Sequence, residues 1–282
     1  MPLTSFDSTF LRKLVRDRSG IVLGEDKTYL IESRLMPVTR LHGLASLDGL
    51  VAKLRNQPPA ALLKQVVEAM TTNETLFFRD AHPFETLGKF VLPDLMKKRA
   101  EQKSLSVWCA AASTGQEPYS LAMTIREQVP GLLNGWKLKM LGTDLSSEVL
   151  ARARAGIYSQ LEVARGMPAP LLARYFQRQS DGTWLIREDL RQMFEFRELN
   201  LLDNYPFGEK YDVVMMRNVL IYFDLETKKQ ILAKVRRVMA PDGYFFLGGA
   251  ETTMNIDDAF ERVNDGKGGA YRLRAAVPAA RA

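Results

Sequence analysis

The sequence predicts an α/β protein with a mainly parallel sheet, an N-terminal all-helical domain and an inserted small antiparallel β-subdomain. From residue 83 onward, apolar strand patterns alternate with helical patterns, which is the order that right-handed βαβ units produce. Before residue 73, apolar residues recur only at helical spacing. The chain of 282 residues is long enough for a large core and a second, smaller domain.

The helical domain is expected to cover residues 1–72 as four helices. Gly20, Gly43 and the pair Pro58-Pro59 separate the apolar runs. Pro37 falls inside the second run and is expected to kink or break that helix. The domain contains ten Lys and Arg residues against seven Asp and Glu, so it has a small excess of positive charge.

The α/β domain is expected to cover residues 83–274. Its last two strands have no clear helix between them, so an antiparallel pair at the sheet edge is expected. The expected strands are 105–110, 137–143, 193–199, 211–216, 244–249 and 269–274, and the main expected helices are 83–99, 118–128, one opening at Ser146, and 225–239. The tail 275–282 has no packing pattern and is expected to be disordered.

Residues 156–195 interrupt this alternation and are expected to form the β-subdomain. Aromatic and leucine residues indicate short helices in its first half. Asp181-Gly182 then separates two short apolar runs, and Asp-Gly in that setting predicts a β-hairpin.

Composition excludes several classes of protein. Hydrophobic residues make up 46% of the chain and no apolar run reaches 18 residues, so no transmembrane helix is expected. The N-terminus lacks the basic region and apolar block of a signal peptide, so a cytoplasmic location is expected. One cysteine excludes an internal disulfide, and with two histidines it makes a metal site improbable. The net charge of +6 fits either a solvated basic surface or an acidic partner.

The segment from Val107 to Ser120 runs from an apolar strand through small residues into a helix opened by Pro118. This layout predicts a ligand cradle, because small side chains let the backbone approach a ligand and a helix N-terminus offers free N–H groups. The segment has one glycine, Gly115, and no lysine, whereas phosphate-binding loops have several glycines or a lysine. It also has an acid, Glu117, so the ligand is expected to be cationic or zwitterionic.

Polar residues follow the first four predicted strands, and the carboxyl ends of parallel strands meet along one rim. Asp144 is the expected partner of a ribose diol, and Glu117 can pair with an ammonium group. Asn200 can hydrogen-bond the amino edge of adenine, with Leu201 against the ring. Each acid alone can be explained by a helix start, but their joint placement favours a nucleoside without phosphates, such as S-adenosylmethionine.

Four segments in order together resemble the chemotaxis receptor methyltransferase family, CheR. They are Met70–Arg79, Ala111–Ser120, Gly142–Asp144 and Arg217–Phe223. The resemblance runs along nearly the whole chain, including the helical domain and the inserted β-subdomain. It implies a Rossmann-like, class I S-adenosylmethionine-dependent methyltransferase fold.

The resemblance also implies the reaction, in which a methyl group passes from S-adenosylmethionine to glutamate side chains on chemoreceptor helices. It further implies that a linker, residues 73–82, contributes to the cofactor site. The implied cofactor contacts are Asn73, Thr75, Arg79, Glu117, Asp144, Asn200, Leu201, Arg217 and Asn218.

The expected chemistry needs no general base, because a glutamate with a pKa of about 4.3 is already ionised at neutral pH. Catalysis is then mainly alignment of carboxylate, methyl group and sulfur, together with exclusion of water. Arg79 is expected to steer the carboxylate electrostatically and Tyr222 to orient it by one hydrogen bond. A tight bidentate contact from Arg79 would stabilise the ground state, so a looser contact is expected.

The expected partner is the helical, acidic cytoplasmic region of a chemoreceptor, with Arg34 and Arg40 of the basic N-terminal domain as docking residues. In this family the β-subdomain can also bind a receptor C-terminal peptide by strand addition. Here the hairpin loop 179–183 is short, which favours a form that does not need that peptide. No direct membrane insertion and no nucleic-acid partner are expected.

Two other functions stay open at this point. The sequence pI of about 9.3 suggests a nucleic-acid methyltransferase as the first alternative. DNA methyltransferases that act on amino groups, however, have a motif like N-P-P-Y, in which Asn and Tyr are three residues apart. Here Asn218 and Tyr222 are four residues apart, with Val-Leu-Ile between them. A non-catalytic module that uses the cofactor as a sensor or structural element is the second alternative, and the intact set of Asp144, Glu117, Arg79 and Tyr222 disfavours it.

Overall fold

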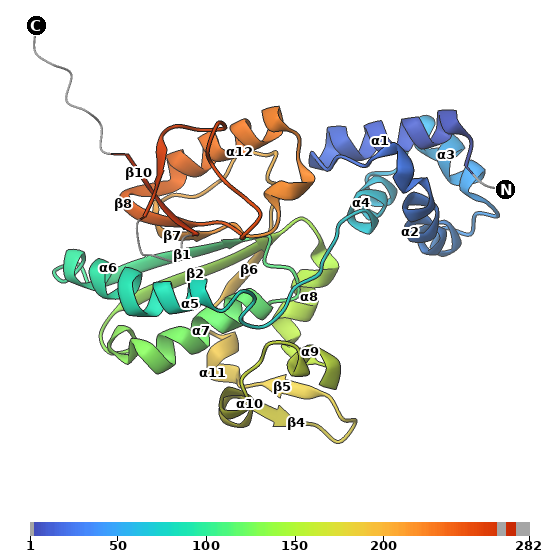
Figure 1. Ribbon diagram of the computed structural model, residues 1–282. Helices are drawn as coiled ribbons and strands as arrows, with labels where there is room; N and C mark the ends of the chain where they lie inside the picture. The colour runs from blue at the N-terminus through green and yellow to red at the C-terminus, as the bar shows by residue number, and fades with distance from the viewer. Residues whose placement is uncertain (1–2, 264–268, 275–282) are drawn as a thin grey trace, which may run out of the picture.

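The structure, a computed structural model, describes residues 3–263 and 269–274. Figure 1 shows a helical domain containing α1 to α4, an α/β domain, and a small β-subdomain that projects from the α/β domain. The predicted fold class is confirmed. The tail 275–282 lies outside the described residues.

Four α-helices and a short 3-10 helix make up the helical domain: α1 (Ser5–Ser19), η1 (Glu25–Lys27), α2 (Thr28–Leu41), α3 (Leu47–Arg55) and α4 (Ala60–Ala69). α1 begins where the Thr4 side chain accepts the N–H of Asp7, and it ends at Gly20, whose φ of +77° suits glycine. α2 continues through Pro37, so the expected break does not occur. Pro37 is exposed, and solvent can therefore satisfy the carbonyl that loses its hydrogen bond.

A seven-stranded sheet forms the α/β domain in the order β6-β2-β1-β7-β8-β10-β9. Its strands are β1 (Ser104–Ala110), β2 (Lys137–Asp144), β6 (Glu195–Glu198), β7 (Tyr211–Met215), β8 (Met239–Phe246), β9 (Phe260–Arg262) and β10 (Ala270–Leu273). The first five strands in this order pair in parallel, while β10 is antiparallel to both β8 and β9. The expected antiparallel pairing of the last two predicted strands is confirmed for β8 and β10, but the edge strand beside them is β9, which was not predicted.

The helices of the α/β domain follow the expected alternation. The expected helix 83–99 forms as three consecutive pieces, one of which is a π-helix. The elements are α5 (His82–Thr86), η2 (Leu87–Val91), α6 (Leu92–Lys98), α7 (Gln116–Gln128), η3 (Pro130–Leu133), α8 (Ser147–Ala155), η4 (Leu220–Tyr222) and α12 (Leu225–Val238).

Strand β1 divides the hydrophobic core into two layers. Its residues Leu105, Val107 and Cys109 belong to the layer under α5 to α8, whereas Trp108 and Ala110 belong to the layer that contains α12 and the helical domain. Side chains of a strand alternate between the two faces of a sheet, so a central parallel strand has to be apolar on both. The carboxyl end of β1 is thereby fixed between two packed layers.

The β-subdomain is a three-stranded sheet in the order β3-β5-β4, and all its strand pairs are antiparallel. Its elements are β3 (Ile157–Tyr158), α9 (Gln160–Ala164), α10 (Ala169–Tyr175), β4 (Phe176–Arg178), β5 (Trp184–Ile186) and α11 (Glu188–Arg191). The predicted hairpin is confirmed, with Gly182 at a φ of +85° in the turn between β4 and β5.

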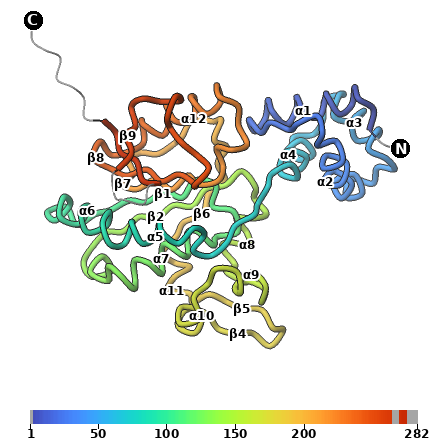
Figure 2. Tube along the Cα trace, in the orientation of Figure 1, coloured from blue at the N-terminus to red at the C-terminus, as the bar shows by residue number. Residues whose placement is uncertain are grey.

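Backbone contacts join the helical domain to the α/β domain. The N–H of Val22 donates to the carbonyl of Tyr222 at 2.9 Å, and Ile21 forms an antiparallel bridge with Phe223. Figure 2 shows the linker between α4 and α5, which is the chain connection between the two domains. The two domains therefore meet along the segment that carries Tyr222.

Candidate active site

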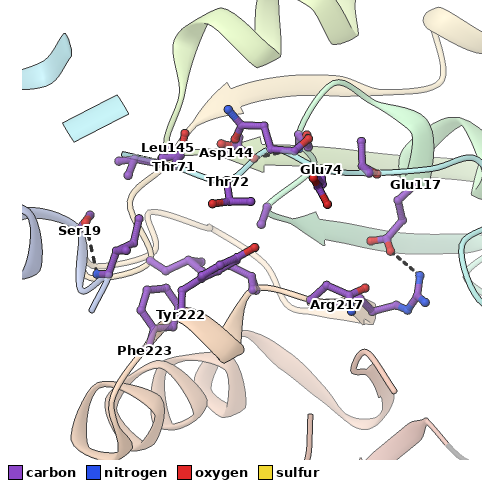
Figure 3. A pocket seen from close by; sticks show the side chains of 18 of the residues that line it. Ser19, Thr71, Thr72, Glu74, Glu117, Asp144, Leu145, Arg217, Tyr222 and Phe223 are labelled. Atoms are coloured by element: carbon purple, nitrogen blue, oxygen red, sulfur yellow. Dashed lines mark hydrogen bonds and ion pairs between the residues drawn. The ribbon is translucent and has the colours of Figure 1, made fainter. Parts of the chain in front are cut away.

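A pocket lies at the carboxyl ends of β1, β2, β6 and β7, where the helical domain and the linker meet the sheet (Figure 3). It contains about 890 Å³ of space between atoms, including the part that is open to solvent. All residues expected to bind cofactor or take part in catalysis line this pocket: Asn73, Thr75, Arg79, Glu117, Asp144, Asn200, Leu201, Arg217, Asn218 and Tyr222.

Asp144 is buried at the end of β2, and its carboxylate is fixed by two backbone groups. One oxygen accepts the N–H of Ser113 at 2.8 Å and the other accepts the N–H of Ser146 at 3.0 Å. Burial raises the pKa of Asp144, and these N–H groups partly offset the rise. Each oxygen keeps lone pairs for a further donor, so the carboxylate is oriented to receive hydroxyl groups.

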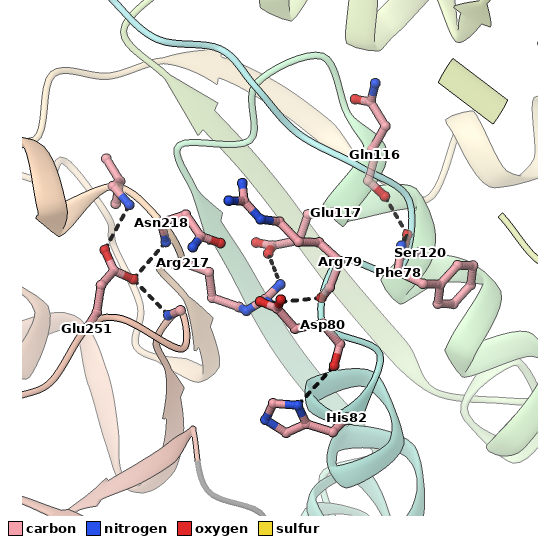
Figure 4. A network of polar contacts seen from close by, with 12 residues as sticks. Phe78, Arg79, Asp80, His82, Gln116, Glu117, Ser120, Arg217, Asn218 and Glu251 are labelled. Carbon is pink, nitrogen blue, oxygen red and sulfur yellow. Dashed lines mark hydrogen bonds and ion pairs between the residues drawn. The ribbon is translucent and has the colours of Figure 1, made fainter. Parts of the chain in front are cut away.

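Glu117 and Arg217 form a buried ion pair beneath the pocket (Figure 4). One Arg217 nitrogen lies 2.8 Å from Glu117 Oε2, while the other contacts Asp80 at 2.7 Å and the carbonyl of Arg79 at 2.9 Å. Burial raises the pKa of Glu117, and the Arg217 guanidinium opposes this rise. Glu117 Oε1 has no hydrogen bond to any described residue, so it is free to accept one from a ligand.

This arrangement changes the role expected for Arg217. Its side chain is 1% exposed and both terminal nitrogens are already paired with protein groups. Its Nε is buried without a partner among the described residues. Arg217 therefore acts on the pocket by holding Glu117 and the linker residue Asp80 in place.

Three linker side chains that line the pocket have few protein partners. Among the described residues, no side-chain hydrogen bond is found for Asn73 or Thr75, and Arg79 makes one long contact, 3.3 Å, to the carbonyl of Glu74. The linker backbone is fixed by the Ser113 hydroxyl, which donates to the carbonyl of Asn73 at 2.8 Å. The backbone is thus anchored while the side chains stay available to a ligand.

The turn after β7 carries Asn218 and Tyr222. The Tyr222 hydroxyl and the side-chain amide of Asn218 have no hydrogen bond within the described part of the chain. The backbone N–H groups of Asn218, Val219 and Leu220 all donate to Glu251, which lies beyond the end of β8. Sequence reasoning missed Glu251, although it follows the neighbouring strand as the other site residues follow theirs.

Strained backbone is concentrated around the pocket. Of nine described non-glycine residues with positive φ, six lie in the segments that build the site. These are Phe78, Asp80, Ala81, Ala111, Ser113 and Asn218. Such conformations persist only where the surrounding structure enforces them, and they are typical of functional sites.

Several expected contacts are made to the protein itself. The Asn200 amide donates to the carbonyl of Arg18 at 2.7 Å and its oxygen accepts the N–H of Leu202 at 3.0 Å. The Asn200 amide keeps a second N–H and a second lone pair, so its expected bond to adenine stays a prediction. Ser19 and Ile21, which were not expected at the site, line the pocket because the same contacts bring the end of α1 to the sheet.

The two expected docking residues differ in their surroundings. Arg34 is half-buried, and its guanidinium donates to the carbonyls of Met70 and Thr71 at 2.9 and 2.8 Å and to the Thr72 hydroxyl at 3.1 Å. It therefore fastens α2 to the segment that follows α4, and a receptor contact by Arg34 stays a prediction. Arg40 is exposed near the end of α2.

The polar side chains that line the pocket fit a ligand that has hydroxyl groups and a positive charge. Three carboxylates, from Glu74, Glu117 and Asp144, line the pocket together with two guanidinium groups, from Arg79 and Arg217, so the lining has one net negative charge. Apolar contacts for a flat ring come from side chains such as Leu145 and Leu201. A polyphosphate would meet net negative charge here, so the pocket suits the adenosine, sulfonium and amino-acid parts of S-adenosylmethionine.

The described residues contain neither a candidate metal site nor a membrane-spanning helix. No group of three or more His, Cys, Asp or Glu side chains in residues 3–263 and 269–274 is placed to hold a metal ion. None of the described helices is both long and apolar enough to cross a membrane.

Comparison with known proteins gives two family matches and several close relatives. Residues 73–268 match the model of the CheR methyltransferase SAM binding domain, and residues 7–71 match that of the CheR methyltransferase all-alpha domain. A Pseudomonas aeruginosa protein named chemotaxis protein methyltransferase 1 is 42% identical, covering 97% of this chain and 100% of its own. Chemotaxis protein methyltransferase Cher2 of Pseudomonas putida is 40% identical with the same coverage, and a Vibrio parahaemolyticus chemotaxis protein methyltransferase is 38% identical over 93% of this chain and 94% of its own.

Proposed function

The chain belongs to the CheR methyltransferase family, and from this premise we propose how its pocket performs the family's reaction. The protein is an S-adenosylmethionine-dependent methyltransferase that forms methyl esters on glutamate side chains of chemoreceptors. The observation that carries the site assignment is the convergence of Glu117, Asp144, Arg79 and Tyr222 on one pocket.

The proposed cofactor site uses the fixed carboxylates as acceptors. Asp144 accepts hydrogen bonds from the ribose hydroxyls, and Glu117 Oε1 accepts one from the ammonium group of the methionine part. Leu201 packs against the adenine ring. Asn73 and Thr75, whose side chains are unpaired in the described structure, supply further polar contacts from the linker. S-adenosylmethionine, when bound, would supply a methyl group on a sulfonium, whose sulfur would leave as a neutral thioether.

The proposed catalytic work of the protein is alignment. The substrate glutamate enters ionised, so no residue has to remove a proton. Arg79 draws the carboxylate toward the pocket electrostatically, and its weak protein contact leaves the guanidinium free to do this. The unpaired Tyr222 hydroxyl donates one hydrogen bond that orients the carboxylate. Closure of the helical domain, the linker and the sheet around the pocket excludes water.

The proposed docking partner is the helical cytoplasmic region of a chemoreceptor, and the proposed location is the cytoplasm. Arg40 is the exposed cation on α2 that contacts acidic residues of this region, while Arg34 contributes by holding α2 to residues 70–72. At the β-subdomain, β4 is an edge strand, which is the geometry that strand addition requires. The five-residue loop beside it still favours a form that does not depend on a receptor tail.

The experiment that tests this function measures labelled methyl transfer from S-adenosylmethionine to a receptor cytoplasmic fragment and to DNA. We expect transfer to the receptor only, with an alkali-labile product, because esters hydrolyse in base. Label on DNA or the absence of transfer would favour one of the alternative functions.

Arg40→Glu tests the docking surface in the same assay. We expect a higher KM for the receptor with unchanged affinity for S-adenosylhomocysteine, because the substitution lies away from the cofactor pocket. Lys13→Glu on α1 is a matched control with the same charge change on an exposed residue. Loss of cofactor affinity together with receptor methylation would contradict a docking role for Arg40.

A further inference from the structure

Glu251 lies just beyond β8, beside the turn that follows β7 (Figure 4). β7 and β8 are neighbouring parallel strands, so their carboxyl ends adjoin. Glu251 does not line the pocket, whereas Asn218, Val219 and Tyr222 of the adjoining turn do. That turn is therefore the structural link from Glu251 to the pocket, and the charge of Glu251 also helps to raise the pKa of Glu117 through space.

The carboxylate of Glu251 accepts four backbone hydrogen bonds. Oε2 lies 2.7 Å from the N–H groups of both Asn218 and Gly248, and Oε1 lies 2.9 Å from that of Val219 and 2.7 Å from that of Leu220. An ionised carboxylate has about four lone-pair sites and no donor, so it matches four converging N–H groups. Hydrogen bonds to a charged acceptor are also stronger than neutral ones.

The conformation that Glu251 holds is costly without such a partner. Asn218 has a φ of +59°, in the left-handed region that non-glycine residues seldom adopt. The N–H groups of Val219 and Leu220 belong to the start of η4 (Leu220–Tyr222), where helical N–H groups lack partners within the helix. Glu251 satisfies these groups together and so stabilises a turn that would otherwise be strained.

The fit around Glu251 is close on its other side as well. A Cβ atom added at Gly248 would lie 2.8 Å from Glu251 Oε2 and 2.6 Å from the Asn218 side-chain nitrogen. Both distances are too short for real contacts, so a side chain at Gly248 would displace the ends of the Glu251 and Asn218 side chains. Two residues after β8 thus hold the turn: Glu251 accepts its N–H groups, and Gly248 leaves room for the Glu251 and Asn218 side chains.

We propose that Glu251 is a positioning residue for methyl transfer. It fixes the turn after β7 so that Asn218 and Val219 face the cofactor and the Tyr222 hydroxyl faces the substrate carboxylate. This inference rests on the proposed function for the role of Tyr222. It extends that function to a residue that touches neither cofactor nor substrate.

Glu251→Gln is the decisive variant, because it keeps the size of the side chain but replaces one acceptor oxygen with an NH₂ group that faces N–H donors. We expect kcat to fall about tenfold or more, since small displacements of reacting groups carry large rate penalties. We also expect weaker binding of S-adenosylhomocysteine, measured by calorimetry, because Asn218 and Val219 line the pocket. Glu261→Gln is the control, since Glu261 is a carboxylate on β9 that pairs with Arg272.

A double-mutant cycle separates positioning from general destabilisation. If Glu251 acts through Tyr222, Glu251→Gln should lower kcat much less in a Tyr222→Phe background than in the wild-type protein. Equal losses in both backgrounds, or kcat and affinity for S-adenosylhomocysteine both at wild-type values, would overturn the proposal. If Tyr222→Phe alone has normal kcat, the proposed role of Tyr222 fails, and the affinity for S-adenosylhomocysteine still decides whether Glu251 positions the turn.

Discussion

The pocket has two walls that differ in how their side chains are held. We call Ser113, Glu117, Asp144 and Arg217 the strand-end wall, and Asn73, Thr75 and Arg79 the linker wall. In the strand-end wall, Glu117 and Asp144 are bound by other protein groups and largely buried. In the linker wall, the backbone is anchored but the side chains make at most one long contact in the described structure.

This difference indicates a division of labour between the walls. A carboxylate that is already oriented loses little entropy when a ligand arrives, which favours cofactor binding. Free side chains over the same pocket can adjust to cofactor and substrate and so complete the site on binding. The strand-end wall is therefore expected to set cofactor affinity, and the linker wall to set the rate.

Removing the cation of the strand-end wall should have the largest effect. Arg217→Met leaves the largely buried Glu117 and the linker residue Asp80 without their partner, which should cost about 3–5 kcal/mol of stability. Chemical denaturation measures this loss. The double variant Arg217→Met/Glu117→Gln should recover part of it, because the uncompensated charge is gone.

A matched control for that prediction is Arg197→Met. Arg197 pairs with Glu195 on the surface of β6, where both side chains are about half exposed. A surface pair is worth about 1 kcal/mol or less, so this variant should lose little stability. Equal losses for Arg217→Met and Arg197→Met would contradict the view that the strand-end wall depends on its buried ion pair.

Removing the cation of the linker wall should affect rate most. Arg79→Ala should lower kcat by about a hundredfold, because the substrate carboxylate loses its electrostatic guide. Stability should change little, since Arg79 makes only a long contact to Glu74. Near-normal turnover with normal cofactor affinity would show that the linker wall does not set the rate.

Asp144→Asn should have a smaller effect than the two arginine substitutions, and the effect should be on cofactor affinity. We expect S-adenosylhomocysteine to bind about tenfold more weakly, because hydrogen bonds to a charged acceptor are replaced by neutral ones. Burial raises the pKa of Asp144 in the folded protein, so the ionised form is fully present only above that raised value.

The same group predicts a pH dependence of cofactor affinity. As the pH falls through the raised pKa, Asp144 takes up a proton and affinity should decline at a higher pH than an ordinary aspartate would cause. Calorimetric titrations across the acidic range test this. The curve of Asp144→Asn should be flatter, with the remaining slope due to Glu117, whose pKa burial also raises.

Much of the fold was predictable because it depends on short-range patterns. The parallel strands and their polar ends followed from apolar runs, and the Asp-Gly hairpin from turn chemistry. β9 was missed because its three residues, Phe260–Arg262, form an edge strand too short for a pattern. β8 starts earlier than expected because Pro241-Asp242-Gly243 is absorbed in a register shift opposite Tyr211 and Val213.

The sequence predicted which residues line the site, but not which protein groups each of them contacts. The expected residues line the pocket because strand ends converge, and that rule needs only the order of elements. Arg34, Asn200 and Arg217 each donate to groups distant in sequence, and no local pattern encodes those contacts. Glu251 was missed for a simpler reason, since the strand-end rule was not applied to the fifth strand.

A crystal structure of the complex with S-adenosylhomocysteine tests the two-wall account most directly. The account predicts that the strand-end wall keeps its hydrogen bonds, with shifts below about 1 Å, while Asn73, Thr75 and Arg79 form new contacts. Breakage of the pair between Glu117 and Arg217, or a cofactor that leaves the linker untouched, would contradict it.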